Sequence, residues 1–244
     1  MARAIGQIEA IHRYPVKSMR GERIEAATLG WHGLVGDRRL ALRRLEERSG
    51  FPWLNAGRLP ELLLFTPLRR EPDASGELPT HVRTPAGAEL PIFGEELAAE
   101  VGRRFGAGVQ MTQLKHGIFD EASVSLIALD TVGEIARLAG ISPDTRRFRP
   151  NLVVRTISSA PFQEDGWLGG VVSFGEGPAA PAIAVTMLDE RCSMVNLDPD
   201  SASTSPEVMK AIVGANQNQA GVYGTVVRTG RIAVGQTLYW QETA

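Results

Sequence analysis

The sequence predicts an α+β protein that is mostly β, with its sheet closed into a barrel. Three observations support this prediction. The 244 residues contain 26 glycines and 15 prolines spread along the chain, the apolar runs are mostly short, and only a few segments show helical spacing. Many short strands separated by turns, with a few helices, are typical of barrel-like α+β folds.

The first predicted strand covers residues 5–14, where Ile5, Ile11 and Tyr14 alternate with polar side chains. Such alternation indicates a strand with one buried face, and Pro15 is expected to end it. A loop rich in proline, glycine and acidic residues is predicted at 71–80. Further strands are predicted at residues 38–43, 62–67, 82–84 and 152–154, and two more within 223–240.

Three helices are predicted from apolar residues that recur at helical spacing. In the first of them, Leu97, Val101 and Phe105 recur every four residues, with acids in the first turn and arginines in the last. This order of charges suits the helix dipole. Ser205 and Pro206 are the predicted N-cap and first residue of the third helix. The three helices are expected at residues 95–105, 125–138 and 206–213.

The composition excludes several classes of protein. A hydrophobic share of 43% and a charged share of 22% are ordinary for a packed globular chain. The net charge of −2 argues against sequence-independent binding to nucleic acid. One cysteine cannot form an internal disulfide or a cysteine-based zinc or iron–sulfur site. No segment has the apolar length of a signal peptide or a membrane span. We therefore expect a soluble, cytoplasmic protein.

Cys192 is the first candidate for chemistry. It follows an apolar, strand-like run and the charged triplet at 189–191. Arg191 beside it would favour the thiolate, the form that attacks electrophiles and binds soft metals. The alternative is a small buried hydrophobic side chain, which is common for a free cysteine. Taken alone, the local sequence favours that alternative.

Clustered cations are the second candidate. Three arginines stand at 146, 147 and 149, just before an apolar strand, and Asn151 follows them. Arg38 and the pair Lys17 and Ser18 also stand at predicted strand ends. Arginine, lysine and serine at such places are suited to bind a phosphate or a carboxylate. For any single cluster, a solvated surface is the more common explanation.

Other motifs give weaker signals. The four histidines are scattered without the spacing of a metal site, and no GxSxG, P-loop or GxGxxG sequence occurs. A cysteine–histidine pair stays open, because such partners need not be close in sequence.

Six short motifs occur along the chain: YPVKS at 14–18, GDR at 36–38, FRPN at 148–151, EDGW at 164–167, RC at 191–192 and DPD at 198–200. Taken together, they resemble the MOSC-domain family. The similarity is greatest to its two-part members, the mitochondrial amidoxime-reducing component and its bacterial counterparts, and it covers nearly the whole chain. It implies an N-terminal MOSC-associated β-barrel region over residues 1–112 and a MOSC domain over 113–244.

The resemblance implies a molybdenum cofactor with Cys192 as the protein ligand to the metal. Glu121 or the adjacent Asp120 would stand near molybdenum and donate protons. One position departs from the family pattern. The mammalian relatives have a small hydroxylic residue two positions before the cysteine, whereas this sequence has Glu190. The residues implied to bind the pterin and its phosphate, or to stand near them, are Lys17, Ser18, Arg38, Ser123, Arg149, Asn151, Arg191 and Tyr223.

The function implied by the resemblance is a molybdenum-dependent reductase of N-hydroxylated compounds. Electrons would come from a separate flavin, ferredoxin or cytochrome protein. The first alternative is a non-catalytic carrier of the cofactor, or a sulfur-handling protein in which Cys192 bears a persulfide. The second is a cysteine hydrolase, which predicts a reactive Cys192 without bound metal.

Overall fold

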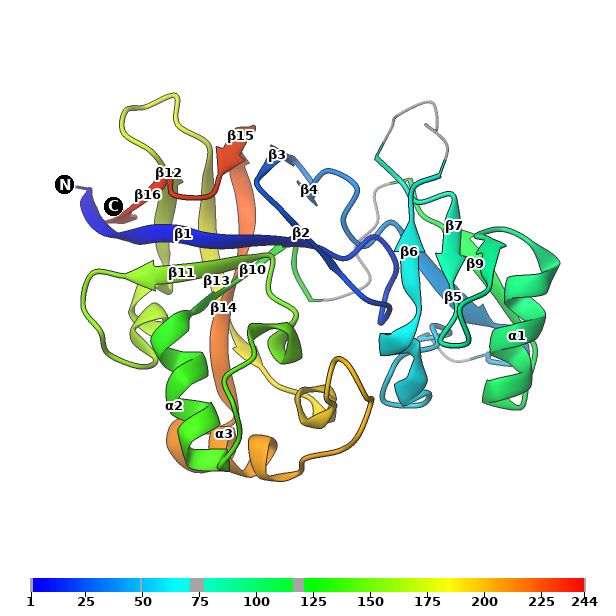
Figure 1. Cartoon of the computed structure of the whole chain (residues 1–244). Helices are drawn as coiled ribbons and strands as arrows, with labels where there is room; N and C mark the ends of the chain where they lie inside the picture. The colour runs from blue at the N-terminus through cyan, green and yellow to red at the C-terminus, as the bar shows by residue number, and fades with distance from the viewer. Residues whose placement is uncertain (1, 49, 71–76, 116–120, 244) are drawn as a thin grey trace.

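A closed barrel is the main feature of the structure, a computed structural model that describes residues 2–48, 50–70, 77–115 and 121–243. The sheet runs in the order β11-β10-β14-β13-β12-β16-β1, and β11 pairs back onto β1 to close the barrel (Figure 1). The prediction of a mostly β, barrel-like fold is confirmed. The strands are β1 (Arg3–Arg13), β10 (Val124–Ala128), β11 (Leu152–Thr156), β12 (Gly170–Phe174), β13 (Ala182–Glu190), β14 (Gln219–Arg228) and β16 (Thr237–Glu242).

Strand β1 joins the two halves of the chain. It pairs antiparallel with β11 on one side and β16 on the other, so the N-terminal strand completes a barrel made mostly of later residues. Ile5, Ile8 and Ile11 of this strand enter the barrel core, together with Leu126 and Phe174. The predicted boundary at residue 112 stays a prediction, and β1 crosses from the first region into the barrel of the second.

A second lobe with its own core lies beside the barrel (Figure 1). Phe65, Leu97 and Val101 are fully or almost fully buried within it. Its elements are β5 (Leu40–Arg44) paired with β9 (Val109–Gln113), the sheet β6 (Thr66–Leu68), β7 (His81–Arg83) and β8 (Glu89–Pro91), and helix α1 (Glu95–Phe105). Three short strands, β2 (Glu22–Ile24), β3 (Ala26–Gly30) and β4 (Gly33–Leu34), link the lobe to the barrel. Strand β2 pairs with β1, and β3 pairs with β4 and with the C-terminal strand β15 (Gly230–Ala233).

Helix α1 has the predicted bounds, whereas the second helix begins later than expected. Residues 124–128, all buried, form the barrel strand β10, and α2 covers Leu129–Ala139. A short continuous apolar run fits a strand buried on both faces as well as a helix, which explains the error. Helix α3 (Glu207–Asn216) packs beside α2 outside the barrel (Figure 1). Ser205 makes no side-chain cap to this helix, so that part of the prediction is wrong.

Three other elements differ from the sequence-based expectation. Residues 60–64 form a 3-10 helix before β6, where a strand was expected from 62. Residues after Cys192 form another 3-10 turn, Ser193–Asn196, although Val195 is buried as its apolar character predicts. The C-terminal stretch contains parts of three strands, β14, β15 and β16, because Gly230 and the turn at 234–236 both interrupt it.

The EDGW motif fixes the helices to the barrel. Glu164 is fully buried and accepts hydrogen bonds from the Ala128 backbone N–H (3.1 Å) and the Thr131 hydroxyl (2.8 Å) at the start of α2. Burial raises the pKa of this carboxyl. Asp165 accepts a 2.7 Å bond from Asn216 of α3. The motif is therefore structural. Across the described residues, no helix has the length and apolar character needed to span a membrane.

Candidate functional site

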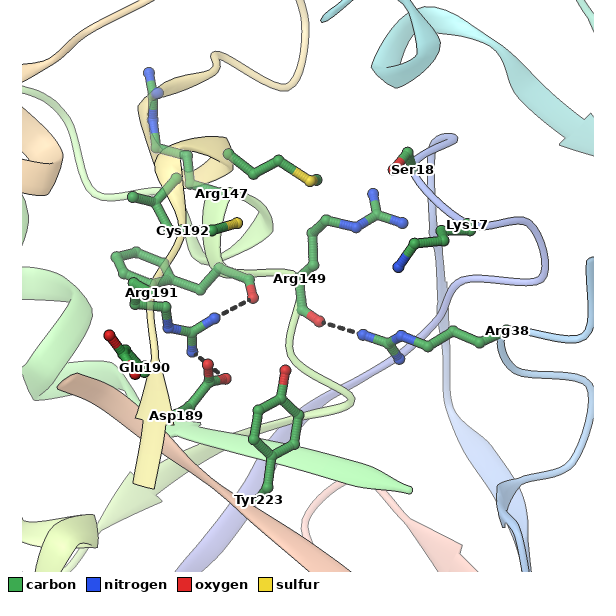
Figure 2. Close-up of a pocket in the computed structure, with 13 residues that line it drawn as sticks. Lys17, Ser18, Arg38, Arg147, Arg149, Asp189, Glu190, Arg191, Cys192 and Tyr223 are labelled. Atoms are coloured by element: carbon green, nitrogen blue, oxygen red, sulfur yellow. Dashed lines mark hydrogen bonds and ion pairs between the residues drawn. The ribbon is translucent and has the colours of Figure 1, made fainter. Parts of the chain in front are cut away.

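A cavity with an empty volume of about 600 Å³ brings together most of the predicted site residues. Figure 2 shows residues of the first half of the chain on one side of it and residues near Cys192 on the other, with Arg149 between them. The predicted residues that line the cavity are Lys17, Ser18, Arg38, Arg149, Arg191, Cys192 and Tyr223.

Three of these residues have a backbone conformation that their side chains disfavour. Ser18, Arg38 and Arg149 have φ values of 64°, 46° and 50°, in the left-handed region. Non-glycine residues adopt this region at an energetic cost, and such residues cluster at functional sites. The surrounding structure must therefore hold these three residues in place at the cavity.

A buried network holds Arg38. Its Nη1 donates to Asp37 Oδ2 (2.5 Å) and to Asn151 Oδ1 (3.2 Å), while Nη2 donates to the Arg149 carbonyl (3.0 Å, Figure 2). The Asn151 amide in turn donates to Asp37 (3.0 Å) and to the His12 carbonyl (3.3 Å). Asn151 is 1% exposed and does not line the cavity. Its position is behind Arg38, where it fixes the loop that carries Arg149.

Arg149 projects into the cavity from that loop. Its Nη1 donates to the Met19 carbonyl (2.8 Å), and its guanidinium lies 4.2 Å from the centre of the Tyr14 ring. Arg38 lies over the same ring at 5.2 Å. Burial raises the pKa of Tyr14 to about 12. The ring therefore stays neutral, and its cation–π contacts orient both guanidiniums.

Cys192 lies at the end of β13 and is exposed. The alternative of a buried hydrophobic cysteine is thus wrong. Figure 2 shows its Sγ directed toward the Arg149 side of the cavity. An accessible sulfur beside several cations is the arrangement that thiol chemistry or soft-metal binding requires.

The Arg191 side chain bonds to buried groups of the protein. It donates to the carbonyls of Ala220 (2.7 Å from Nε) and Phe148 (2.8 Å from Nη1), and it forms a 2.8 Å ion pair with Asp189. This packing needs Gly221, which has φ +89°, because a Cβ there would meet the Leu126 carbonyl at 2.5 Å. Arg191 thus anchors the segment before Cys192 to the Phe148 loop.

Besides Asn151, the structure leaves three predicted residues outside the cavity or undescribed. Glu121 is exposed and does not line it. Ser123 also lies outside the lining, and its carbonyl packs closely against Gly33. Asp120 lies outside the described residues. Sequence reasoning gave no cofactor-binding role to the other lining residues, although all lie within three positions of predicted ones and Arg147 belongs to the cluster of cations identified above: Arg147, Phe148, Asp189, Glu190, Met194 and Val195.

His12, next to this network on β1, is expected to make stability depend on pH. It is 8% exposed, and its pKa falls from 6.5 to about 4 through burial, with repulsion by Arg23 and Arg146 adding to the shift. As the pH falls below 6.5, the unfolded chain gains a proton that the folded protein does not, so folding is weakened until about pH 4. The difference corresponds to about 3 kcal/mol.

Urea unfolding of the His12→Gln variant and the wild type at about pH 7 and about pH 4 measures this contribution. We expect the wild type to lose about 3 kcal/mol more than the variant between the two conditions. Equal losses in both proteins would contradict the prediction. The pH-dependent contributions of other groups cancel in the comparison.

The fold and the cavity define a class of two-part β-barrel protein whose site offers one accessible thiol and a set of cationic and hydroxyl donors. Models of known families match both parts, the MOSC N-terminal β barrel domain over residues 5–113 and the MOSC domain over 113–239. The chain belongs to the MOSC family. Proteins of this family are associated with a molybdopterin cofactor.

Solved structures agree with the fold at low sequence identity. The YUAD protein of Bacillus subtilis is 13% identical, with a TM-score of 0.54 over 100% of both chains. YiiM of Escherichia coli is 10% identical, with a TM-score of 0.45 over 100% of this chain and 71% of that one. No curated protein matches the sequence significantly. The likeness to YUAD supports the fold alone.

The residues of the cavity fit the cofactor that this family is associated with. A pterin bearing a phosphate needs cationic and hydroxyl donors, which Lys17, Ser18 and Arg149 provide at the cavity wall. A metal carried by such a group needs a soft protein ligand, and the exposed sulfur of Cys192 stands in the same cavity.

Proposed function

We propose that this MOSC protein is a molybdenum-cofactor oxidoreductase that reduces N-hydroxylated compounds. The observation that carries the proposal is the convergence of an accessible thiol, Cys192, with Lys17, Ser18 and Arg149 in one cavity built from both halves of the chain. When bound, the cofactor would supply the two-electron removal of oxygen from an N–O bond.

The roles of the residues follow from their contacts. Cys192 would hold the metal. Lys17, Ser18 and Arg149 would bind the phosphate and pterin with charge-assisted hydrogen bonds. Arg38 and Asn151 would act as positioning residues, since both hydrogen-bond to Asp37 and to one another, and Arg38 also holds the loop of Arg149. Tyr223 lines the cavity and would contact the cofactor or the substrate.

The proposal includes a separate electron donor of the flavin, ferredoxin or cytochrome type. A chain with one cysteine cannot ligate an iron–sulfur cluster of its own, so the reducing equivalents would arrive from another protein. It also includes a cytoplasmic location, the reducing compartment in which an accessible free thiol persists.

Two measurements on the purified protein test the proposal. Elemental analysis should find close to one molybdenum per chain, and the molybdenum-loaded protein should reduce an amidoxime with an artificial electron donor. Molybdenum-loaded protein that reduces no amidoxime, hydroxylamine or N-hydroxylated base would overturn the catalytic proposal.

A non-catalytic carrier or sulfur-handling role is the second candidate. The position of Glu121 favours this role. Glu121 was expected to donate protons to the site, but it is exposed and does not line the cavity in the described structure. In that role Cys192 would bear a persulfide. Mass spectrometry of the intact protein would then show a reductant-labile addition of one sulfur atom, about 32 Da, that is absent from Cys192→Ser.

Removing Arg149 should weaken cofactor retention. The Arg149→Ala variant lacks a charge-assisted contact worth about 1.5–3 kcal/mol, which corresponds to a roughly 10- to 150-fold loss of affinity. Molybdenum content after dialysis measures the effect. Arg155→Ala is the control, because Arg155 is an exposed arginine paired with Glu9 outside the cavity. Equal metal content in Arg149→Ala and wild type would place the phosphate elsewhere.

A further inference from the structure

A second cavity lies next to the first and shares Arg149 with it. Its empty volume is about 520 Å³, and neither Lys17 nor Cys192 belongs to its lining. The polar side chains that line it are Arg20, Arg23, Arg146, Arg149, His12 and Tyr14. No carboxylate is among the described residues of the lining, so the wall of this cavity presents cations and neutral donors.

The guanidiniums around this cavity are only partly neutralised by their contacts. Arg20 and Arg146 share Asp200, at 3.0 Å and 2.6 Å, and Arg146 also pairs with Asp144. Arg23 is exposed and donates at 3.4 Å to a backbone carbonyl, that of Glu9. Asp144 and Asp200 therefore pair with Arg20 and Arg146 only, whereas the contact of Arg23 is to a neutral carbonyl, which leaves a positive potential in a concave site.

Two buried side chains of the lining make no hydrogen bond to any described residue. His12 is 8% exposed, and its imidazole stacks on Tyr14 with the ring centres 6.3 Å apart. The Tyr14 hydroxyl is buried without a partner in the described structure. A neutral imidazole carries one donor, and His12 lines the cavity wall. An acceptor inside the cavity would pair with that donor.

We propose that this cavity is a second anion site, which binds a doubly charged tetrahedral oxyanion of the phosphate class. Arg23 and Arg149 would supply the charge-assisted contacts, and His12 would supply a neutral donor. Since Arg149 lines both cavities, occupancy of one would alter the affinity of the other, and the effect would be reciprocal. This site goes beyond the proposed function and would stand even if the first cavity held no molybdenum.

The His12 ring is a local reporter of anion binding. We propose an NMR titration of the imidazole in sodium sulfate and in sodium chloride at equal ionic strength, with His12→Gln to assign the signal. Sulfate is the probe because it stays doubly charged through the titration. Chloride controls for screening of Arg23, Arg146 and Asp144, the charges that act on this ring. We expect the pKa of His12 to rise from about 4 by clearly more in sulfate than in chloride.

Three variants locate the ion, each compared in both salts. In Arg23→Gln, a roughly tenfold higher sulfate concentration should be needed for the same rise in the pKa of His12. Arg231→Gln, an exposed arginine on β15, should leave the sulfate response unchanged, whereas Lys17→Gln in the first cavity should keep the response and shift it only through the coupling at Arg149. Equal pKa values of His12 in sulfate and chloride would overturn the proposal. A response lost in Lys17→Gln and kept in Arg23→Gln would also overturn it, because the ion would then lie beside Cys192.

Discussion

The Cys192→Ser variant is expected to lose molybdenum-dependent reduction while its folding free energy stays within about 0.5 kcal/mol of the wild type. The thiol is exposed, so its replacement removes little packing. A serine oxygen has nearly the same size but is a poorer ligand for a soft metal. The expected loss is complete within the detection limit of an amidoxime-reduction assay, and urea unfolding measures the folding free energy.

The adjacent Ser193→Ala variant is the matched control. Ser193 is also exposed and follows Cys192 directly, but it is absent from the cavity lining. It should keep both molybdenum and activity. A Cys192→Ser protein that retained molybdenum and reduced amidoximes at the wild-type rate would remove the thiol from the mechanism. Lost activity together with a large loss of stability would mean that the side chain is structural.

The parts of the fold that local patterns determine could be predicted from the sequence. Helix α1 has the predicted bounds, because its apolar spacing, first-turn acids and terminal Gly106 all indicate the same element. The start of α2 could not be predicted, because residues 124–128 are mostly apolar, without a strand-like alternation, and their strand state depends on pairing with β11 and β14. The closure of the barrel by β1 and β11 depends likewise on residues about 150 positions apart.

The sequence predicted which residues line the site better than it predicted the role of each residue. Seven of the predicted residues line one cavity, and all of them except Tyr223 belong to the motifs that carried the family resemblance. Their roles depend on distant partners that no local pattern reveals. Asn151, for example, bonds to Asp37, 114 positions away, and so stands behind the cavity. The left-handed backbone of Ser18, Arg38 and Arg149 was equally hidden, since glycine and asparagine are the usual residues there.

Asp37 connects these observations, and its replacement should be the most destabilising change at the site. Its carboxylate accepts from the Tyr14 backbone N–H (2.6 Å), from Arg38 (2.5 Å) and from Asn151 (3.0 Å), and it is 6% exposed. Asp37→Ala would leave the Arg38 charge buried without its carboxylate, together with two unmet donors. Breaking a buried pair in this way costs about 3–5 kcal/mol.

Urea unfolding of Asp37→Ala beside Glu9→Ala tests this expectation. Glu9 pairs with Arg155 at 2.9 Å, but the Arg155 side chain is largely in solvent and that of Glu9 is partly exposed, so its loss should cost at most about 1 kcal/mol. Because Arg38 holds the carbonyl of Arg149, the Asp37 variant should also retain less molybdenum than Glu9→Ala even where both are folded. Similar unfolding energies for the two variants would show that the Asp37 network does not hold the cavity together.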